Sequence, residues 1–172
     1  MSQILFTDIN YLDSCNSKTL SFACIGQAPV QKRAKITYKN KHRPVYYDPS
    51  NLEKKNWRQT LQSVFQEKSI SSPVFLSDSL SSKGVKLSIT FHIKRPMIDY
   101  ISKKNIKILK DIHHKYPSSQ DIDNLLKFVM DAMHEVVYLN DQVIHEIHCR
   151  KIFCDDDNTG IQRTEIQMIQ LK

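Results

Sequence analysis

Residues 85–94 read VKLSITFHIK, with an apolar side chain at every second position from Val85 to Ile93. Alternation with a period of two is typical of a β-strand that buries one face. The same pattern recurs at residues 20–26, 143–153 and 161–171. We therefore expect a β-sheet built from these segments.

Two longer segments carry helical spacing instead. From Asn51 to about Lys68 the apolar residues recur every third or fourth position, after an Asp48-Pro49-Ser50 sequence typical of a helix start. In Asp121–Val137 a helical wheel places one apolar face opposite a polar one. The residues of that apolar face are Ile122, Leu125, Leu126, Val129, Met130 and Met133. Strands combined with two long helices predict an α+β fold, a single domain with a mixed β-sheet and two main helices.

The other segments are expected to lie outside this framework. Residues 1–18 form an N-terminal extension, either a frayed arm or an extra edge strand, and residues 19–172 form the domain. Residues 27–44 are predicted to be a loop or a loose hairpin. Residues 97–120 are predicted to be irregular, with a short helical piece at Lys103–Lys110.

The composition is that of an ordinary globular chain, with 40% hydrophobic and 25% charged residues among 172. No stretch approaches the roughly 18 apolar residues that span a bilayer, and no basic cluster precedes an apolar run at the N-terminus. We therefore expect an intracellular protein that is not secreted and contacts no membrane. Its four cysteines are expected to be reduced, with a zinc site at His148, Cys149 and Cys154 as an alternative of unusual spacing.

Charge is distributed unevenly along the chain, whose net charge is +7. Residues 30–58 and residues 83–115 each hold nine basic and two acidic residues, whereas residues 116–172 hold five basic and ten acidic residues. Two basic blocks beside an acidic third indicate a polyanion-binding surface around a carboxylate cluster, with solvated basic loops as the alternative. The expected DNA-phosphate contacts are Lys32, Arg33, Lys35, Lys39, Lys41 and Arg43.

The carboxylates concentrate in the second predicted helix. Asp123, Lys127 and Asp131 follow one another at intervals of four residues, which places them in one stripe, and Asp121 lies at the helix start. Asp141 follows an apolar run, so the chain can fold back and bring a third carboxylate beside the first two. The structural alternative is a helix cap with a surface ion-pair ladder along the stripe.

Two or three carboxylates beside a lysine suit phosphodiester hydrolysis with a divalent metal. Mg²⁺ prefers oxygen ligands and keeps several waters, so no histidine or cysteine is needed. The metal activates a water and offsets charge on the phosphate, while Lys127 stabilises the developing oxyanion. Mn²⁺ is a second metal that this ligand set accepts.

These residues resemble the RusA-like Holliday junction resolvases. The family shows D-x-D-N-L-x-K, an Asp four residues beyond the Lys, and an Asp-Asp-x-Gln-Val element. Here the first element is Asp121-Ile122-Asp123-Asn124-Leu125-Leu126-Lys127, and Asp131 and Tyr138-Leu139-Asn140-Asp141-Gln142-Val143 follow. Gly26-Gln27-Ala28-Pro29, Tyr47-Asp48-Pro49 and Arg95-Pro96 match weaker upstream elements of the family. Asn140 stands where the family has the first Asp of the pair, and one residue is missing before Gln142.

The resemblance implies a magnesium-dependent endonuclease that resolves four-way DNA junctions as a homodimer, in recombination and repair, without an organic cofactor. It assigns catalysis to Asp121, Asp123, Lys127 and Asp141, with the three aspartates as metal ligands. A two-fold dimer suits a junction, because symmetric nicks need two equivalent sites. The alternatives are a non-catalytic module that binds branched DNA and a metal-dependent nuclease with another nucleic-acid substrate, such as RNA.

Several other residues have two readings. His113 and His114 are expected to be an exposed loop pair, or else phosphate contacts, and His134 extends the polar stripe of the second helix. Tyr46 and Tyr47 lie within the first basic block, where a ring could stack on an unpaired base.

Overall fold

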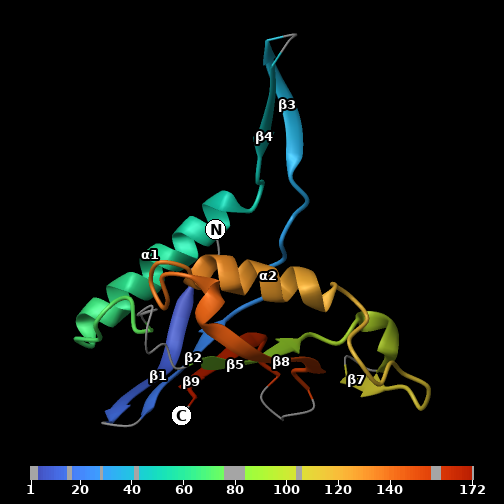
Figure 1. The fold of residues 1–172 in the computed structure, drawn as a ribbon. Helices are drawn as coiled ribbons and strands as arrows, with labels where there is room; N and C mark the ends of the chain where they lie inside the picture. Colours follow the sequence, from blue (N-terminus) through green and yellow to red (C-terminus); the bar gives the residue numbers. More distant parts are fainter. Residues whose placement is uncertain are drawn as a thin grey trace.

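A five-stranded sheet with two helices on one face forms the body of the protein (Figure 1). The computed structural model describes residues 4–14, 17–27, 29–40, 43–75, 84–103, 106–155 and 160–171, with the backbone alone at residues 38–40, 43, 103 and 106. The strand order is β1-β2-β9-β5-β8, in which β5 and β8 are parallel and the other neighbours are antiparallel. This single α+β domain with a mixed sheet confirms the predicted fold class.

The strands of the sheet follow the alternating segments of the sequence. They are β1 (Leu5–Ser14), β2 (Ser17–Ile25), β5 (Val85–Ile93), β8 (Ile144–Phe153) and β9 (Arg163–Gln170). β5 is the most buried of them, since it lies between two neighbours and under a helix layer. A parallel pair requires a crossover, and the segment between β5 and β8 supplies it with α2 (Ile122–Met133).

The helices bury one stripe each against the sheet. α1 (Asn51–Glu67) packs through Trp57, Leu61 and Phe65, and Trp57 lies in the core with 2% of its surface exposed. The Trp57 ring lies edge-on to Phe6 of β1 and to Phe128 of α2, at centroid distances of 5.0 and 6.0 Å. This aromatic cluster joins the N-terminal strand to both helices, so it fixes where α2 lies. No helix in the described ranges is long and apolar enough to cross a membrane.

Two short hairpins lie outside the main sheet. β3 (Lys35–Asn40) pairs with β4 (Arg43–Tyr47), and this hairpin projects away from the body (Figure 1). A one-turn helix, η1 (Met97–Asp99), leads into the second hairpin, β6 (Tyr100–Lys103) and β7 (Ile106–Leu109). Residues 27–44 therefore contain the first strand of a hairpin, which was one of the two structures expected for them.

The structure corrects two predicted helical segments. The described part of residues 103–110 contains no helical piece: the alternation of Ile106 and Ile108 with lysine and leucine suits a strand, and β7 is the result. The second helix ends at Met133 instead of Val137, because Glu135 takes a positive φ of 69° and the branched Val136 and Val137 turn into the core. The chain then passes through η2 (Asp141–Val143) into β8.

Residues 5–14 form an edge strand, the second of the two alternatives for the N-terminal extension. β1 pairs with β2 along its length and contributes Phe6 and Ile9 to the core, at 7% and 8% exposure. The division of the chain at residue 18 stays a prediction, and the packing of Phe6 gives a way to test it.

We expect Phe6→Ala to lower the free energy of unfolding by about 3 kcal/mol, because it removes a buried ring that contacts Trp57 and Phe22. Leu12→Ala, on the same strand and 70% exposed, is the matched control and should change it by less than about 0.5 kcal/mol. Urea unfolding of both variants measures the difference. An unchanged midpoint for Phe6→Ala would show that β1 is a detachable arm.

Candidate active site

The start of α2 presents two exposed carboxylates. Asp121 occupies the N-cap position and Asp123 the first turn. The Asp121 carbonyl accepts the first helical hydrogen bond from Leu125 N at 3.2 Å. Its side chain makes no capping bond with the backbone and accepts a long hydrogen bond from Asn124 Nδ2, at 3.5 Å. The carboxylate of Asp121 therefore does not serve as the helix cap that a structural role would require.

Asp123 and Lys127 do not form the surface ladder that the sequence left open. Neither side chain makes a hydrogen bond or ion pair with any described residue, although both lie exposed one helical turn apart. Asp131, the third member of the stripe, pairs instead with Lys54 of α1. A carboxylate and a lysine without partners at neighbouring helix positions remain available to an external ligand.

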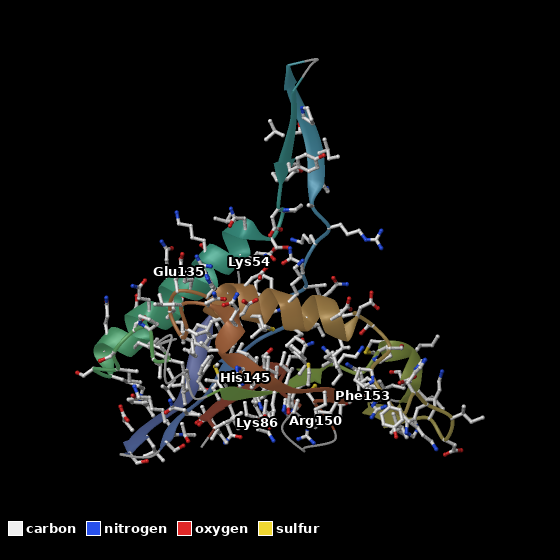
Figure 2. The ribbon with its side chains drawn as sticks, viewed as in Figure 1. Lys54, Lys86, Glu135, His145, Arg150 and Phe153 are labelled. Carbon is white, nitrogen blue, oxygen red and sulfur yellow. The ribbon has the colours of Figure 1, made fainter. Side chains whose placement is uncertain are left out.

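Lys54 is a buried lysine that joins two aspartates. Only 8% of its surface is exposed, and its Nζ lies 2.7 Å from Asp48 Oδ2 and 2.5 Å from Asp131 Oδ2. The side chain lies between α1 and α2 (Figure 2). Asp48 directly follows β4, so Lys54 connects the foot of the projecting hairpin, the first turns of α1 and the end of α2.

Hydrogen bonds in this bridge shift the pKa values of Asp48 and Lys54. Burial would raise the pKa of Asp48, but hydrogen bonds from Lys54, Gln31 and the Ser50 amide outweigh it and lower the pKa to about 2. Burial would likewise lower the pKa of Lys54, yet its bonds to Asp131 and Asp48 raise it. The ammonium of Lys54 and the carboxylate of Asp48 thus stay charged at neutral pH.

Lys54 was not among the residues predicted for the site, although the sequence carries a signal for it. Lys54 stands three residues before Trp57, on the same helix stripe as Leu61 and Phe65. A lysine on an otherwise apolar stripe is buried only when carboxylates pair with it. That rule could have linked it to the acidic residues of α2.

Contacts from Arg58 and Tyr138 stabilise the C-terminal end of α2. Arg58 of α1 donates to the Asp131 carbonyl at 2.9 Å and pairs with Glu135 at 3.1 Å, and the buried Tyr138 hydroxyl donates to the Met130 carbonyl at 2.7 Å. Burial, followed by the nearby charges of Asp141 and Asp131, raises the pKa of Tyr138. Both aspartates therefore lie close to Tyr138.

Asp131 and Asp141 line one open pocket of about 520 Å³. Its other lining residues are Asp48, Asn51, Lys54, Arg58, Met130, His134 and Tyr138. Asp121 and Asp123 lie at the opposite end of α2, and ten residues of helix place Asp121 about 15 Å along the axis from Asp131. Asp141 therefore lines the same pocket as Asp131, at the other end of α2 from Asp121 and Asp123.

The described residues contain no group of three or more histidine, cysteine, aspartate or glutamate side chains that could hold a metal ion. No such group forms at the alternative zinc site, which comprises His148 and Cys149 on β8 and the buried Cys154. The expected folding back of Asp141 onto the first two aspartates is thus not seen within one chain. The roles assigned to Asp121, Asp123, Lys127 and Asp141 stay predictions.

The basic residues expected to contact phosphate belong to the projecting hairpin and its foot. Arg33 and Lys35 are exposed and form no ion pair with described residues, whereas Lys32 pairs with Glu53 at 2.7 Å. Lys39 and Arg43 lie on β3 and β4, where the backbone alone is described, and Lys41 lies outside the described residues. The foot is close to the carboxylates, because Gln31 N donates to the Asn124 carbonyl of α2 at 3.2 Å.

His113 and His114 lie in the loop before α2, whereas His134 lies at the end of this helix. His114 Nδ1 lies 2.6 Å from the buried Asp99, and its side chain is half-exposed. His113 Nδ1 lies 2.7 Å from the Lys110 carbonyl, which holds this loop together. His134 is the C-cap of α2 and faces the pocket beside Asp131.

Comparison with known proteins bears on what these residues do. The sequence model of a family described as endodeoxyribonuclease RusA matches residues 26–168. The match takes in the projecting hairpin, both helices and the acidic stripe, and it begins after β1 and β2. Comparisons with curated proteins and with solved structures gave no match.

The Lys54 bridge makes a prediction about Asp131. Asp131→Asn should lower the free energy of unfolding by about 1–3 kcal/mol, because a buried ammonium loses a charged partner. Asp123→Asn on the same helix removes no contact within the described chain and should change it by less than about 0.5 kcal/mol. Urea unfolding compares the two. Equal stability of both variants would contradict the bridge.

Acid should also act on the bridge through Asp48. Its folded pKa of about 2 lies below the unfolded value near 3.9, so its contribution is present above about pH 4 and is lost as the pH falls toward 2. The melting temperature of the wild type should therefore fall more steeply across this range than that of Asp48→Asn. Parallel curves for the two proteins would show that Asp48 is not ion-paired in solution.

Proposed function

The chain belongs to the RusA family of endodeoxyribonucleases, and on that premise we propose that it cuts four-way DNA junctions with the help of a divalent metal ion. The family match supports an enzyme of Holliday junction resolution in general. The metal, the paired nicks, the dimer and the residue roles are our proposal, as is a place for the protein inside the cell in recombination and repair.

The observation that carries the proposal is the unpaired state of Asp123 and Lys127. A helix stripe of alternating charge normally satisfies itself through ion pairs four residues apart. Here the third member, Asp131, is bound by Lys54, while Asp123 and Lys127 make no bond to a described residue. Charges left free at the exposed start of a helix suit the binding of a metal ion and a phosphate.

The donor set fits magnesium or manganese in its chemistry. Asp121 and Asp123 offer carboxylate oxygens that no described cation neutralises. Mg²⁺ keeps several waters and commonly takes only one or two protein carboxylates together with substrate phosphates. Asp121 and Asp123 would therefore hold the metal, and the metal would supply an activated water and charge stabilisation.

Lys127 acts on the phosphate beside this site. Its position one turn after Asp123 places both residues on the same exposed stripe of α2. The ammonium stabilises negative charge that develops on the phosphate oxygens during cleavage. It is not a metal ligand, so its removal should affect the rate far more than metal binding.

A homodimer explains two features together. Two equivalent sites related by a two-fold axis produce symmetric nicks on a four-way junction. In addition, Asp141 lines the pocket at the far end of α2 from Asp121 and Asp123, and a second copy would supply an Asp141 to their metal. We assign Asp141 that role within the proposed dimer.

Basic residues near the foot of the hairpin bind the DNA backbone and position it at this site. Arg33 and Lys35 are exposed and available for phosphates, and the Gln31–Asn124 bond keeps their segment against the first turn of α2. Contacts of this kind bind the backbone without reading sequence. The remaining proposed contacts are Lys32, Lys39, Lys41 and Arg43.

Cleavage of a synthetic four-way junction with Mg²⁺, beside a matched linear duplex and a matched RNA junction, tests the proposal. We expect Asp123→Asn to abolish nicking of the DNA junction while binding survives, because the change removes a metal ligand but also a charge that repels DNA. Lys127→Ala should lower the single-turnover rate on the order of a hundredfold at saturating Mg²⁺.

Asp13→Asn, a half-exposed carboxylate on β1, is the control and should cleave normally. Full activity of Asp123→Asn would overturn the site. Binding of the junction without cleavage by the wild type at any Mg²⁺ or Mn²⁺ concentration would instead identify a non-catalytic DNA-binding module.

A further inference from the structure

The β3–β4 hairpin is the least explained part of the structure. It forms a two-stranded sheet of its own and stands away from the body (Figure 1), with its side chains projecting freely on both sides (Figure 2). An isolated two-stranded hairpin is only marginally stable in water. Because this hairpin nevertheless projects into solvent, we expect its surface to bind a partner.

One face of the hairpin is apolar. Ile36 and Tyr46 lie directly opposite each other across the two strands and are 52% and 70% exposed, and the exposed Pro44 lies two residues from Tyr46 on the same side. Tyr46 thus stands on a strand with most of its side chain exposed. An aromatic ring presented in this way suits stacking on a flat apolar partner.

The charge around this face is entirely positive. No acidic residue occurs between Lys32 and Tyr47, whereas Lys32, Arg33, Lys35, Lys39, Lys41 and Arg43 all lie in this span. A second hairpin of the same protein would carry the same charge and be repelled. A polyanion that also exposes flat rings, namely a nucleic acid with unstacked bases, matches both the charge and the aromatic face.

The foot of the hairpin is held firmly against the proposed active site. Asp48 accepts hydrogen bonds from Ser50 N at 2.8 Å, Gln31 Nε2 at 3.1 Å and Lys54 Nζ at 2.7 Å. Lys32 N donates to Ser50 Oγ at 2.8 Å, and Gln31 N reaches the Asn124 carbonyl. Both ends of the hairpin are therefore tied to α1 and α2, and DNA that contacts the hairpin lies at a set position relative to Asp123.

We propose that the β3–β4 hairpin enters the open centre of a DNA junction and that Tyr46 stacks on a base at the branch point. This inference rests on the proposed function and adds a specificity element to it. Within a linear duplex every base face is covered by its neighbours, so the ring finds no partner. At a branch point the arms part and the end base pairs expose their faces, so the hairpin distinguishes the junction from the duplex.

The test uses a four-way junction with 2-aminopurine at the branch point, and the full chain without added metal so that binding occurs without cleavage. Wild type should change the fluorescence of this base, and Tyr46→Ala should lose the change and bind the junction about 5- to 100-fold more weakly. Tyr46→Trp should restore both. Leu12→Ala, equally exposed at 70% on β1, should behave as wild type.

The linear duplex separates this proposal from simpler ones. Tyr46→Ala should bind the duplex as wild type does, whereas Arg33→Ala with Lys35→Ala should weaken both DNA shapes. Equal loss on duplex and junction would overturn the proposal, because the hairpin would then lie in a groove of ordinary DNA. Conversion of a dimer to a monomer by Tyr46→Ala, in sedimentation, would overturn it in favour of a second copy as partner.

Cleavage measured in parallel keeps this result apart from the proposed function. If the wild type changes the 2-aminopurine fluorescence through Tyr46 but cleaves no junction, the hairpin proposal is supported and the nuclease proposal is overturned. If Tyr46→Ala cleaves the junction and changes the fluorescence as the wild type does, the proposed role of the hairpin in junction recognition is overturned, whereas the nuclease proposal stands.

Discussion

The ion bridge of Lys54 with Asp48 and Asp131 determines how the parts of this protein are placed. A buried ammonium is costly unless carboxylates surround it, so the lysine can occupy its position only when both aspartates are present. Those aspartates belong to the foot of the hairpin and to the end of α2. One side chain therefore fixes the hairpin, α1 and α2 against each other.

This bridge also explains why the two ends of α2 differ. Its C-terminal half is occupied by protein contacts, since Asp131 meets Lys54 and Arg58, and Met130 accepts from Tyr138. Its N-terminal half has Asp121, Asp123 and Lys127 exposed, with Asp123 and Lys127 unbonded to described residues. Residues with the same spacing and similar chemistry thus divide into a set held by protein contacts and an exposed set to which we assign the proposed metal and DNA contacts.

Much of this arrangement could be predicted from the sequence, and the errors have physical causes. Strict alternation identified β5, and the apolar stripes identified both helices. Periodicity could not show that Asp131 forms an ion pair with Lys54. The two residues are 77 positions apart in the sequence and meet through the packing of α1 on α2. The meeting of Asp141 with Asp121 and Asp123 stays a prediction: among the described residues Asp141 lines the pocket at the far end of α2, a position that spacing along the sequence could not show.

The most direct measurement is the NMR signal of the Lys54 ammonium in protein labelled with ¹⁵N at lysine, assigned by its loss in Lys54→Arg. The structure predicts an ammonium that exchanges slowly with water and stays protonated at higher pH than an exposed lysine, since burial lowers its pKa less than its bonds to Asp131 and Asp48 raise it. The Lys127 ammonium, which is free of described partners, should exchange too fast to observe under the same conditions. A Lys54 signal that exchanges as fast as that of Lys127 would contradict the bridge and the division of α2 that rests on it.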